Sequence, residues 1–337
     1  MMDGRIAGKT VTAADVAKAA GVSRSMVSRA FRETAYVAAD QREKILRTAK
    51  DLGYSPNVLA QALISGKTPF VGVVTSGLAN PIHAELYGAL VQEMQARSLV
   101  PLAFQMNSGD GEVAGLRTAI ETIKRFEVRQ IVLTSFAVSD RVLDACLDTG
   151  LRVHLLNRAD DAGRTGAVCA DVAQGGVLAA RHVLEQGRTR IAILDGAPGA
   201  WTARQRRAGY EQGLSNAGHS AVAVLPGDYS ERCGFLAAED IARMQPRPDA
   251  VLCANDLSAC GMITGLHAQG MRVPDDIAVV GFDDIPQAAW SSFELTTVSL
   301  PVQPMVSQLC ERVEDDAPPE IDPVTLLPCA LKRRGAG

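Results

Sequence analysis

The stretch VTAADVAKAAGVSRSMVSRAF, residues 11–31, predicts two short helices joined by a tight turn. Thr12 stands three residues before Asp15, which is the spacing of a capping box at a helix start. The apolar residues that follow fall on one helical face: Val16, Ala17 and Ala20. Gly21 ends this helix, and Ser23 can cap the next one. Two helices joined by a glycine-containing turn predict a helix-turn-helix, whose second helix lies in the major groove of DNA.

The second helix, predicted over 24–31, has an apolar face and a polar face. Its apolar side chains are Val27, Ala30 and Phe31, and its polar ones are Arg24, Ser25, Ser28 and Arg29. A third helix is predicted over 40–52, and Gly53 closes it. Its apolar stripe comprises Ile45, Leu46, Ala49 and Leu52. On spacing alone, any small three-helix domain with solvated basic side chains remains an alternative.

Charge is distributed unevenly along the chain. Of the 337 residues, the first 67 hold eleven Lys and Arg against six Asp and Glu, whereas the remainder holds 23 against 32. The formal net charge of −4 therefore conceals a basic head on an acidic body. Such an asymmetry is expected when one end of a protein meets the phosphates of nucleic acid.

Residues 11–63 resemble the headpiece of the lactose/galactose repressor family of bacterial transcription regulators. The resemblance rests on three elements at fixed spacing: T-x-x-D-V-A-x-x-A-G-V-S, then V-S-R, then G-Y-S-P-N. It implies a DNA-binding headpiece over 1–55 and a homodimer that binds double-stranded, pseudo-palindromic operator DNA. The residues that it assigns to DNA binding are Thr12, Ser23, Arg24, Ser25, Ser28, Arg29, Tyr36, Asn57, Ala60 and Leu63.

A hinge helix and linker are predicted over 56–69. Pro56 suits the first turn of a helix, and NVLAQALI over 57–64 can form only about two turns. Helices that short are marginal alone, so we expect this segment to become helical on DNA. The resemblance implies that two copies pair in the minor groove, where Leu63 wedges the central base step. The alternative is a plain linker.

From Phe70 onward, apolar strands alternate with amphipathic helices, which predicts parallel sheets covered by helices on both faces. The length of 70–337 exceeds one comfortable core, so this effector-binding and dimerisation domain should have two doubly wound α/β lobes. We expect the lobes at about 70–157 plus part of 287–312, and at about 158–286 plus the C-terminal segment. G-V-V-T-S-G-L-A-N-P and V-P-D-D-I-A-V-V-G-F-D-D make the body resemble periplasmic sugar-binding proteins and, more closely, the effector domain of the same family.

Both lobes should bind a ligand at the carboxyl ends of their strands, and a hinge motion should close them around it. The resemblance places these residues at the cleft: Ile82, His83, Asn157, Arg158, Trp201, Thr202, Arg206, Tyr229, Asn255 and Asp283. Carboxylate, guanidinium and amide groups suit the hydroxyls of a sugar, and Trp201 or Tyr229 could stack on its face. Asn255 could instead cap the following helix, and Arg158 could form a structural ion pair.

The expected small-molecule effector is a sugar or sugar derivative. Arg204, Arg206 and Arg207 near the cleft also allow a sugar acid or a phosphate, whereas Ile82 and His83 offer no aromatic stack for a nucleobase. We expect induction, in which the ligand weakens DNA binding by a repressor. The alternatives are a co-repressed regulator that senses a non-sugar metabolite, and a sugar-binding protein without a role on DNA.

The body lacks the motifs G-x-G-x-x-G after a strand, G-x-x-x-x-G-K-[ST], G-x-S-x-G and H-E-x-x-H. Five scattered histidines and seven cysteines without C-x-x-C spacing indicate no metal site, so we expect neither an enzyme nor a bound cofactor. The N-terminus has no apolar h-region, and no apolar run reaches about 18 residues, which predicts a cytoplasmic protein without membrane contact. The C-terminus has no leucine heptads, so a dimer is expected.

Overall fold

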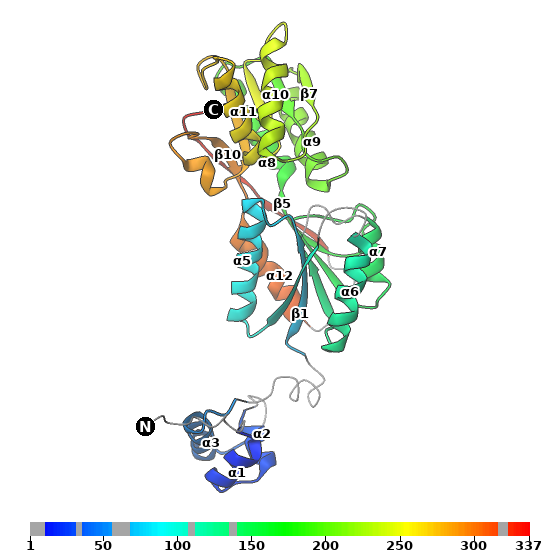
Figure 1. The fold of residues 1–337 in the computed structure, drawn as a ribbon, viewed down its shortest axis with the longest axis vertical. Helices are drawn as coiled ribbons and strands as arrows, with labels where there is room; N and C mark the ends of the chain where they lie inside the picture. Colours follow the sequence, from blue (N-terminus) through cyan, green and yellow to red (C-terminus); the bar gives the residue numbers. More distant parts are fainter. Residues whose placement is uncertain (1–10, 32–35, 56–67, 107–111, 135–139, 316–322) are drawn as a thin grey trace, which may run out of the picture. The chain divides into compact units, whose positions relative to one another are not determined.

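The computed structural model describes residues 11–31, 36–55, 68–106, 112–134, 140–315 and 323–337. The chain divides into two compact units, residues 1–69 and 70–337, which Figure 1 draws as a ribbon. These units are named the head and the body below. No helix in the described ranges is both long and apolar enough to cross a lipid bilayer.

Three helices make up the described part of the head: α1 (Ala13–Ala20), α2 (Arg24–Ala30) and α3 (Ala39–Asp51). The predicted capping box begins α1, because the Thr12 N–H donates to Asp15 Oδ2 at 2.9 Å and the Asp15 N–H donates to Thr12 Oγ1 at 3.4 Å. Gly21 ends α1 with a φ of 68°, in the left-handed region. Ser23 caps α2, since its Oγ accepts from the Met26 N–H at 3.2 Å. The helix-turn-helix is confirmed.

The head core is built from small and branched side chains: Val16, Ala17, Ala20, Val27, Ala30, Ile45 and Ala49. Half-buried Phe31 packs edge to face on Tyr54, with ring centroids 5.8 Å apart. The predicted apolar stripe of α3 is too wide, because Leu46 and Leu52 are each 39 % exposed. The physical reason is that α1 and α2, at eight and seven residues, are too short to cover more than one row of α3.

Two six-stranded sheets form the body, one in each lobe (Figure 1). The first has the order β11-β5-β4-β3-β1-β2, and its neighbouring strands all pair in parallel. Its strands are β1 (Phe70–Ser76), β2 (Val100–Met106), β3 (Gln130–Leu133), β4 (Arg152–Leu156), β5 (Ala167–Asp171) and β11 (Val324–Pro328). The predicted doubly wound arrangement is confirmed for this lobe.

The second sheet has the order β12-β10-β9-β8-β6-β7, in which β12 runs antiparallel to β10 and the other pairs are parallel. Its strands are β6 (Ile191–Leu194), β7 (Ala223–Leu225), β8 (Ala250–Cys253), β9 (Ala278–Asp283), β10 (Thr296–Ser299) and β12 (Ala330–Lys332). β6, β8 and β9 are buried along their whole length, as expected for central strands that helices cover on both faces.

Helices pack against both sheets. They are α5 (Pro81–Ala96), α6 (Glu112–Arg125), α7 (Asp140–Leu147), α8 (Val172–Glu185), α9 (Trp201–Ser215), α10 (Glu231–Arg243), α11 (Asp256–Ala268) and α12 (Val302–Glu314), with the 3-10 helix η1 (Pro286–Ala289). In the second lobe, α8 packs on α9 and α10 packs on α11. A Cβ on Gly209 of α9 would lie 2.1 Å from the Ala173 carbonyl oxygen of α8, so this close approach requires glycine. The glycine thereby sets the position of α9.

The chain crosses between the lobes three times. β5 pairs with β4 in the first sheet, and α8 then begins the second lobe at Val172. After β10, α12 packs on α5 and β5 of the first lobe, β11 pairs with β5, and β12 returns to the second sheet. The structure therefore differs from the expected boundary near 157, because 167–171 lies in the first sheet and both sheets share the C-terminal segment. Local periodicity could not reveal this, since Val324 pairs with distant Ala167.

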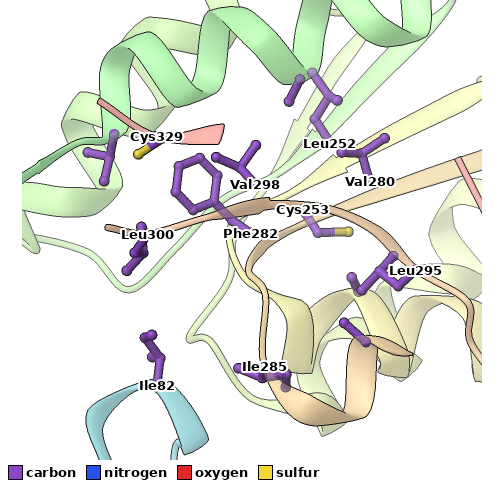
Figure 2. Close-up of a cluster of buried hydrophobic side chains, with 14 of the residues drawn as sticks. Ile82, Leu252, Cys253, Val280, Phe282, Ile285, Leu295, Val298, Leu300 and Cys329 are labelled. Carbon is purple, nitrogen blue, oxygen red and sulfur yellow. The ribbon is translucent and has the colours of Figure 1, made fainter. Parts of the chain in front are cut away.

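Figure 2 shows the apolar core where the two lobes meet. Phe282 of β9 lies beside Val298 of β10 and Cys329, and all three side chains are buried. Ile82, at the start of α5 in the first lobe, belongs to the same cluster of buried side chains. This packing holds the end of β9 and the start of α5 close to the junction of the lobes.

Candidate ligand pocket and DNA-reading helix

A pocket lies between the two lobes of the body. It is lined by Asn80, Ile82, His83, Asn157, Thr202, Arg206, Tyr229 and Asp283, and it encloses a cavity of about 20 Å³. The first-lobe residues follow β1 and β4. In the second lobe, Thr202 and Arg206 follow β6, Tyr229 follows β7, and Asp283 is the last residue of β9. In doubly wound sheets, ligands bind at such carboxyl ends, where the strand order reverses. This volume is far below the roughly 300–1,000 Å³ that is usual for ligand pockets.

Of the residues that line the pocket, Asn80 alone was not among those predicted to lie at the cleft. Asn80 caps α5, since its Oδ1 accepts from the Ile82 N–H at 3.3 Å, and Pro81 occupies the first turn. An asparagine before proline, directly after a buried strand, is a recognisable helix start, so the sequence held a signal for this residue.

His83 contributes a neutral ring to the first-lobe wall. Its Nδ1 lies 3.1 Å from the Gly77 carbonyl oxygen, which accepts its hydrogen bond when Nδ1 carries the proton. Burial lowers the pKa of His83 below its usual value, and backbone hydrogen bonds with Gly77 and Ser76 only partly oppose this. The imidazole is therefore uncharged at neutral pH.

Arg206 and Asp283 place opposite charges in the second-lobe wall. Arg206 Nη2 lies 3.7 Å from Asp283 Oδ1, and both side chains are almost fully buried. The guanidinium also lies 3.9 Å over the centre of the Phe282 ring, and its Nη1 donates to the Ala254 carbonyl. These contacts direct the guanidinium towards the pocket from the N-terminal part of α9.

The carboxyl group of Asp283 is only partly ionised at neutral pH. Burial raises its pKa to about 7, while Arg206 opposes the rise and Glu85 of α5 adds to it. The carboxyl group therefore changes protonation near neutral pH. In its protonated form it can donate a hydrogen bond to a ligand, and in its ionised form it can accept two or more.

Two buried polar atoms in this pocket have no hydrogen-bond partner among the described residues. They are Asn157 Oδ1, an acceptor from the first lobe, and Arg206 Nε, a donor from the second. Leaving a buried polar atom unsatisfied costs about 1–3 kcal/mol. A ligand that can both donate and accept hydrogen bonds would satisfy both atoms and join the lobes.

The backbone is strained at the same place. Asn157, Tyr229 and Asp283 line the pocket with φ values of 58°, 68° and 112°, in a region that side-chain-bearing residues rarely adopt. Tyr229 is buried, and its hydroxyl lies 3.4 Å from Thr202 Oγ1. Strained residues of this kind cluster at ligand sites, where the surrounding structure holds them.

Three predicted ligand residues lie outside the pocket lining. Asn255 caps α11 by accepting from the Ser258 N–H at 3.0 Å, and its Nδ2 donates to the Tyr229 carbonyl at 3.0 Å. The helix-cap alternative is therefore the observed one, and Asn255 acts by holding Tyr229. Trp201 is half-buried, packs against both buried clusters of the body, that of the first lobe included, and does not line the pocket. Arg158, next to Asn157, is buried and does not line the pocket.

A larger hollow, of about 470 Å³, lies between α9 and β7 in the second lobe alone. Its arginines are paired: Arg207 with Glu211 at 2.8 Å and with Asp195 at 3.3 Å, and Arg204 with Asp161. Within the described ranges, no group of three or more His, Cys, Asp and Glu side chains is arranged to hold a metal ion. The interlobe pocket is therefore the better candidate for a small ligand, since it has unsatisfied polar atoms and contributions from both lobes.

The polar face of α2 is the candidate DNA-reading surface of the head. Thr12, Ser23, Arg24, Ser25 and Arg29 are exposed, Ser28 is half-buried, and Tyr36 is 92 % exposed. Ser23 and Ser25 are joined by a hydrogen bond of 2.9 Å between their hydroxyls, so they form one polar group at the start of the helix. The other predicted DNA contacts, Asn57, Ala60 and Leu63, lie outside the described residues.

The fold and these two surfaces define a class of protein in which a helix-turn-helix precedes a two-lobed binding domain. The family model of bacterial regulatory proteins of the lacI family matches residues 12–57, and that of the periplasmic binding protein-like domain matches 180–336. The two matches fall on the head and on the C-terminal half of the body.

Relatives and solved structures agree with this division. The chain is 28 % identical to the HTH-type transcriptional repressor PurR of Photobacterium profundum, over 90 % of this chain and 92 % of that protein. It is 28 % identical to the probable HTH-type transcriptional repressor ExuR of Bacillus subtilis, over 87 % of each. The lac repressor dimer bound to operator and the anti-inducer ONPF matches with a TM-score of 0.82 and 28 % identity, over 97 % of this chain and 99 % of that one. The transcriptional regulator CelR in complex with cellobiose matches with a TM-score of 0.71 and 26 % identity, over 97 % and 100 %.

The chain belongs to the lacI family of bacterial regulatory proteins. It is a DNA-binding, ligand-responsive transcriptional repressor of that family, with a periplasmic-binding-protein-like body.

Proposed function

We propose that this repressor binds a pseudo-palindromic operator as a homodimer and that a small polyhydroxylated molecule, a sugar or sugar acid, controls its affinity for DNA. The observation that carries the choice of ligand is the pair of unsatisfied atoms in the interlobe pocket, Asn157 Oδ1 and Arg206 Nε. They call for a donor and an acceptor on the same small molecule.

Hydroxyl groups meet that requirement, because each can donate one hydrogen bond and accept others. A hydroxyl that donates to Asn157 and a neighbouring oxygen that accepts from Arg206 would bridge the two lobes. Asp283 adds an acceptor with a pKa of about 7, and a ligand carboxylate would pair with Arg206 in a charge-assisted bond. These contacts favour a sugar or sugar acid that binds the closed body more tightly than the open one.

The pocket offers little for a flat aromatic base. Tyr229 is the aromatic residue in its lining, and Ile82 and His83 occupy the opposite wall. The solved relative CelR holds cellobiose, which supports a carbohydrate. The likeness to the PurR repressors makes a non-sugar metabolite, acting as a co-repressor, the second candidate.

A thermal-shift screen of the full chain tests the ligand class. Hexoses, disaccharides, uronic acids and purine bases would each be added to the parent protein, to Asn157→Ala and to Asn216→Ala, which changes an exposed asparagine outside the pocket. A compound at 100 times its Kd stabilises the parent by about 2.7 kcal/mol, because it binds only the folded state.

We expect a sugar or uronic acid to raise the melting temperature of the parent and of Asn216→Ala, and to leave that of Asn157→Ala unchanged. A response to purine bases alone would reject the sugar proposal. An equal response of Asn157→Ala would reject the pocket.

The DNA part of the proposal rests on the exposed polar face of α2. Arg29 can bind the guanine edge through two hydrogen bonds, which contributes about 1–3 kcal/mol of discrimination. Arg29→Ala should therefore weaken binding to the operator while largely sparing binding to random DNA. Equal losses on both DNAs, measured by titration at one salt concentration, would show that Arg29 contacts only phosphate.

The proposal must also state whether the ligand weakens or strengthens operator binding. We infer that closing the lobes on the sugar weakens operator binding, so the molecule acts as an inducer. A gel-shift titration of the operator with the best compound from the thermal-shift screen checks this, and tighter binding with that compound would instead show co-repression.

A further inference from the structure

The C-terminal tail, residues 329–337, is tied to the turn that follows β9. Arg334 makes three hydrogen bonds, one to Asp284 in this turn and two to Leu295 and Thr296, where β10 begins. Its backbone N–H donates to Thr296 Oγ1 at 2.8 Å, its Nη1 donates to the Leu295 carbonyl at 2.9 Å, and its Nη2 donates to Asp284 Oδ1 at 2.6 Å. Two of these hydrogen bonds fix the guanidinium and the third fixes the backbone of Arg334, so the tail holds Asp284 in one position.

That position matters because Asp283 and Asp284 form a strained pair. Their φ values are 112° and 60°, so two successive side-chain-bearing residues adopt positive φ. On the other side of the turn, the Ile285 N–H donates to Asp256 Oδ2 at 2.9 Å. The turn that directs Asp283 into the pocket is thus held between a buried carboxyl group on α11 and Arg334 from the tail.

Electrostatics links this turn to the opposite lobe. Burial raises the pKa of Glu85 on α5, and the negative charge of Asp284 raises it further. Glu85 in turn raises the pKa of Asp283. A carboxyl group of the first lobe therefore repels two carboxyl groups of the second, and the repulsion is strongest when all three are ionised.

The charged and titratable groups around the turn come from five elements. They are Glu85 and His83 on α5, Asp256 on α11, Arg206 on α9, Asp283 and Asp284 after β9, and Arg334 in the tail. The two cations both belong to the second lobe. Arg206 faces Asp283 and Arg334 pairs with Asp284, so each aspartate has its own compensating charge.

We propose that Arg334 is a positioning residue of the interlobe pocket, which holds the turn that carries Asp283 and neutralises Asp284, so that Glu85 of the first lobe can approach. The proposal rests on the proposed function only for the use of the pocket. Without Arg334, Asp284 is an uncompensated charge opposite Glu85, and the lobes separate at any pH at which both carboxyl groups are ionised. The tail thereby regulates effector binding from outside the pocket.

The fluorescence of Trp201 measures lobe contact without any ligand. Trp201 begins α9 in the second lobe and packs against the first-lobe core, so its emission shifts to the red when the lobes part. The chain has two tryptophans, and the other, Trp290, is 55 % exposed. The full chain carrying Trp290→Phe would be the parent for all variants, and acrylamide quenching would accompany each spectrum.

In Arg334→Ala we expect a red-shifted emission and faster acrylamide quenching at pH 8, and both changes should become smaller as the pH is lowered and Glu85 gains a proton. Adding Glu85→Gln should restore the parent spectrum at pH 8, because it removes the repelling charge. Arg334→Lys should stay close to the parent. The matched control is Arg333→Ala, since Arg333 is an exposed neighbour that pairs with Glu185 at 3.6 Å, and it should change nothing.

A parent-like spectrum for Arg334→Ala at every pH would overturn the proposal. So would a failure of Glu85→Gln to restore contact, because loss of tail anchoring alone would then explain the change. If circular dichroism shows that Arg334→Ala does not fold, the double variant with Glu85→Gln decides: a folded, parent-like double variant supports the charge argument, and an unfolded one rejects it. No sugar is used, so these outcomes are independent of the ligand screen.

Discussion

The two walls of the interlobe pocket are built differently. The first-lobe wall offers neutral groups, Asn80, His83 and Asn157, mostly at the start of a helix or the end of a strand. The second-lobe wall offers a buried ion pair, Arg206 and Asp283. Arg206 lies on α9, which packs closely on α8 at Gly209, and Asp283 has a strained backbone. The difference indicates that the second lobe holds charge in a fixed position, whereas the first lobe completes the hydrogen bonds on closing.

Among the substitutions that test this difference, removing Arg206 should cause the largest loss in the free energy of unfolding. Arg206→Ala removes one partner of a buried pair together with its bond to the Ala254 carbonyl and its contact with the Phe282 ring, and breaking such a pair typically costs about 3–5 kcal/mol in the free energy of unfolding. Arg204→Ala on the same helix is the control, because its pair with Asp161 is exposed and is worth about 1 kcal/mol or less. Urea unfolding of both variants measures the difference. Equal losses would mean that the second-lobe wall does not depend on its buried charges.

The helix packing behind the second-lobe wall should give the next effect. Gly209→Ala forces a Cβ against the Ala173 backbone, so we expect a loss near the upper end of about 1–3 kcal/mol for overpacking. Gly88→Ala is the matched change on α5 of the first lobe, where a Cβ meets nothing within 4 Å. It should raise stability by roughly 0.5–1 kcal/mol, because alanine favours the helix. Opposite signs in thermal unfolding would sharpen the contrast, and a loss at Gly88 would weaken it.

Burial of Asp283 makes the stability of the second-lobe wall fall as the pH rises towards 7. Its pKa is raised from about 3.8 to about 7 on folding, so its contribution to stability is present at low pH and is lost as pH rises through 7. Asp283→Asn should remove this slope, which is on the order of 2 kcal/mol between pH 5 and 8. The measurement is the free energy of unfolding of both proteins across that range. An unchanged slope in the variant would show that another group titrates.

His83 should make the first-lobe wall respond to pH with the opposite sign. Burial lowers its pKa in the folded state, so its contribution is present above pH 6.5 and is lost as pH falls below that value. His83→Gln should reduce the acid sensitivity of unfolding. Melting temperatures at pH 7.5 and 5.5 check this. A larger acid sensitivity in His83→Gln would contradict the assignment of a neutral buried imidazole.

Much of the site could be predicted because it depends on local sequence and on a general property of parallel sheets. Strands such as β8 and β9 are continuous apolar runs, and the residues that follow or end such strands must gather at one edge of the sheet. The resemblance to the family placed Asn157, Tyr229 and Asp283 at such an edge, and the structure brings all three to the pocket lining. The resemblance to a known headpiece added the roles of the residues on α2.

Other features depend on partners that lie far away in the chain. Asn255 looked like a ligand contact from its place after β8, but its two polar atoms are used by the Ser258 N–H and the Tyr229 carbonyl. Trp201 looked like a stacking ring, but it packs on the other lobe. Leu46 and Leu52 follow the helical period of α3, but the helices that face them are too short to cover them.

The sequence by itself determined the capped helix-turn-helix and the alternation of strands and helices, because these follow from hydrogen-bonding and packing between near neighbours, whereas its resemblance to a family supplied the candidate pocket residues. Only the tertiary structure decided that β5 and β11 complete the first sheet and that Arg334 holds Asp284, 50 positions away. The physical reason is that a strand edge or a buried charge accepts any suitable partner, and the folded chain alone sets which one comes near.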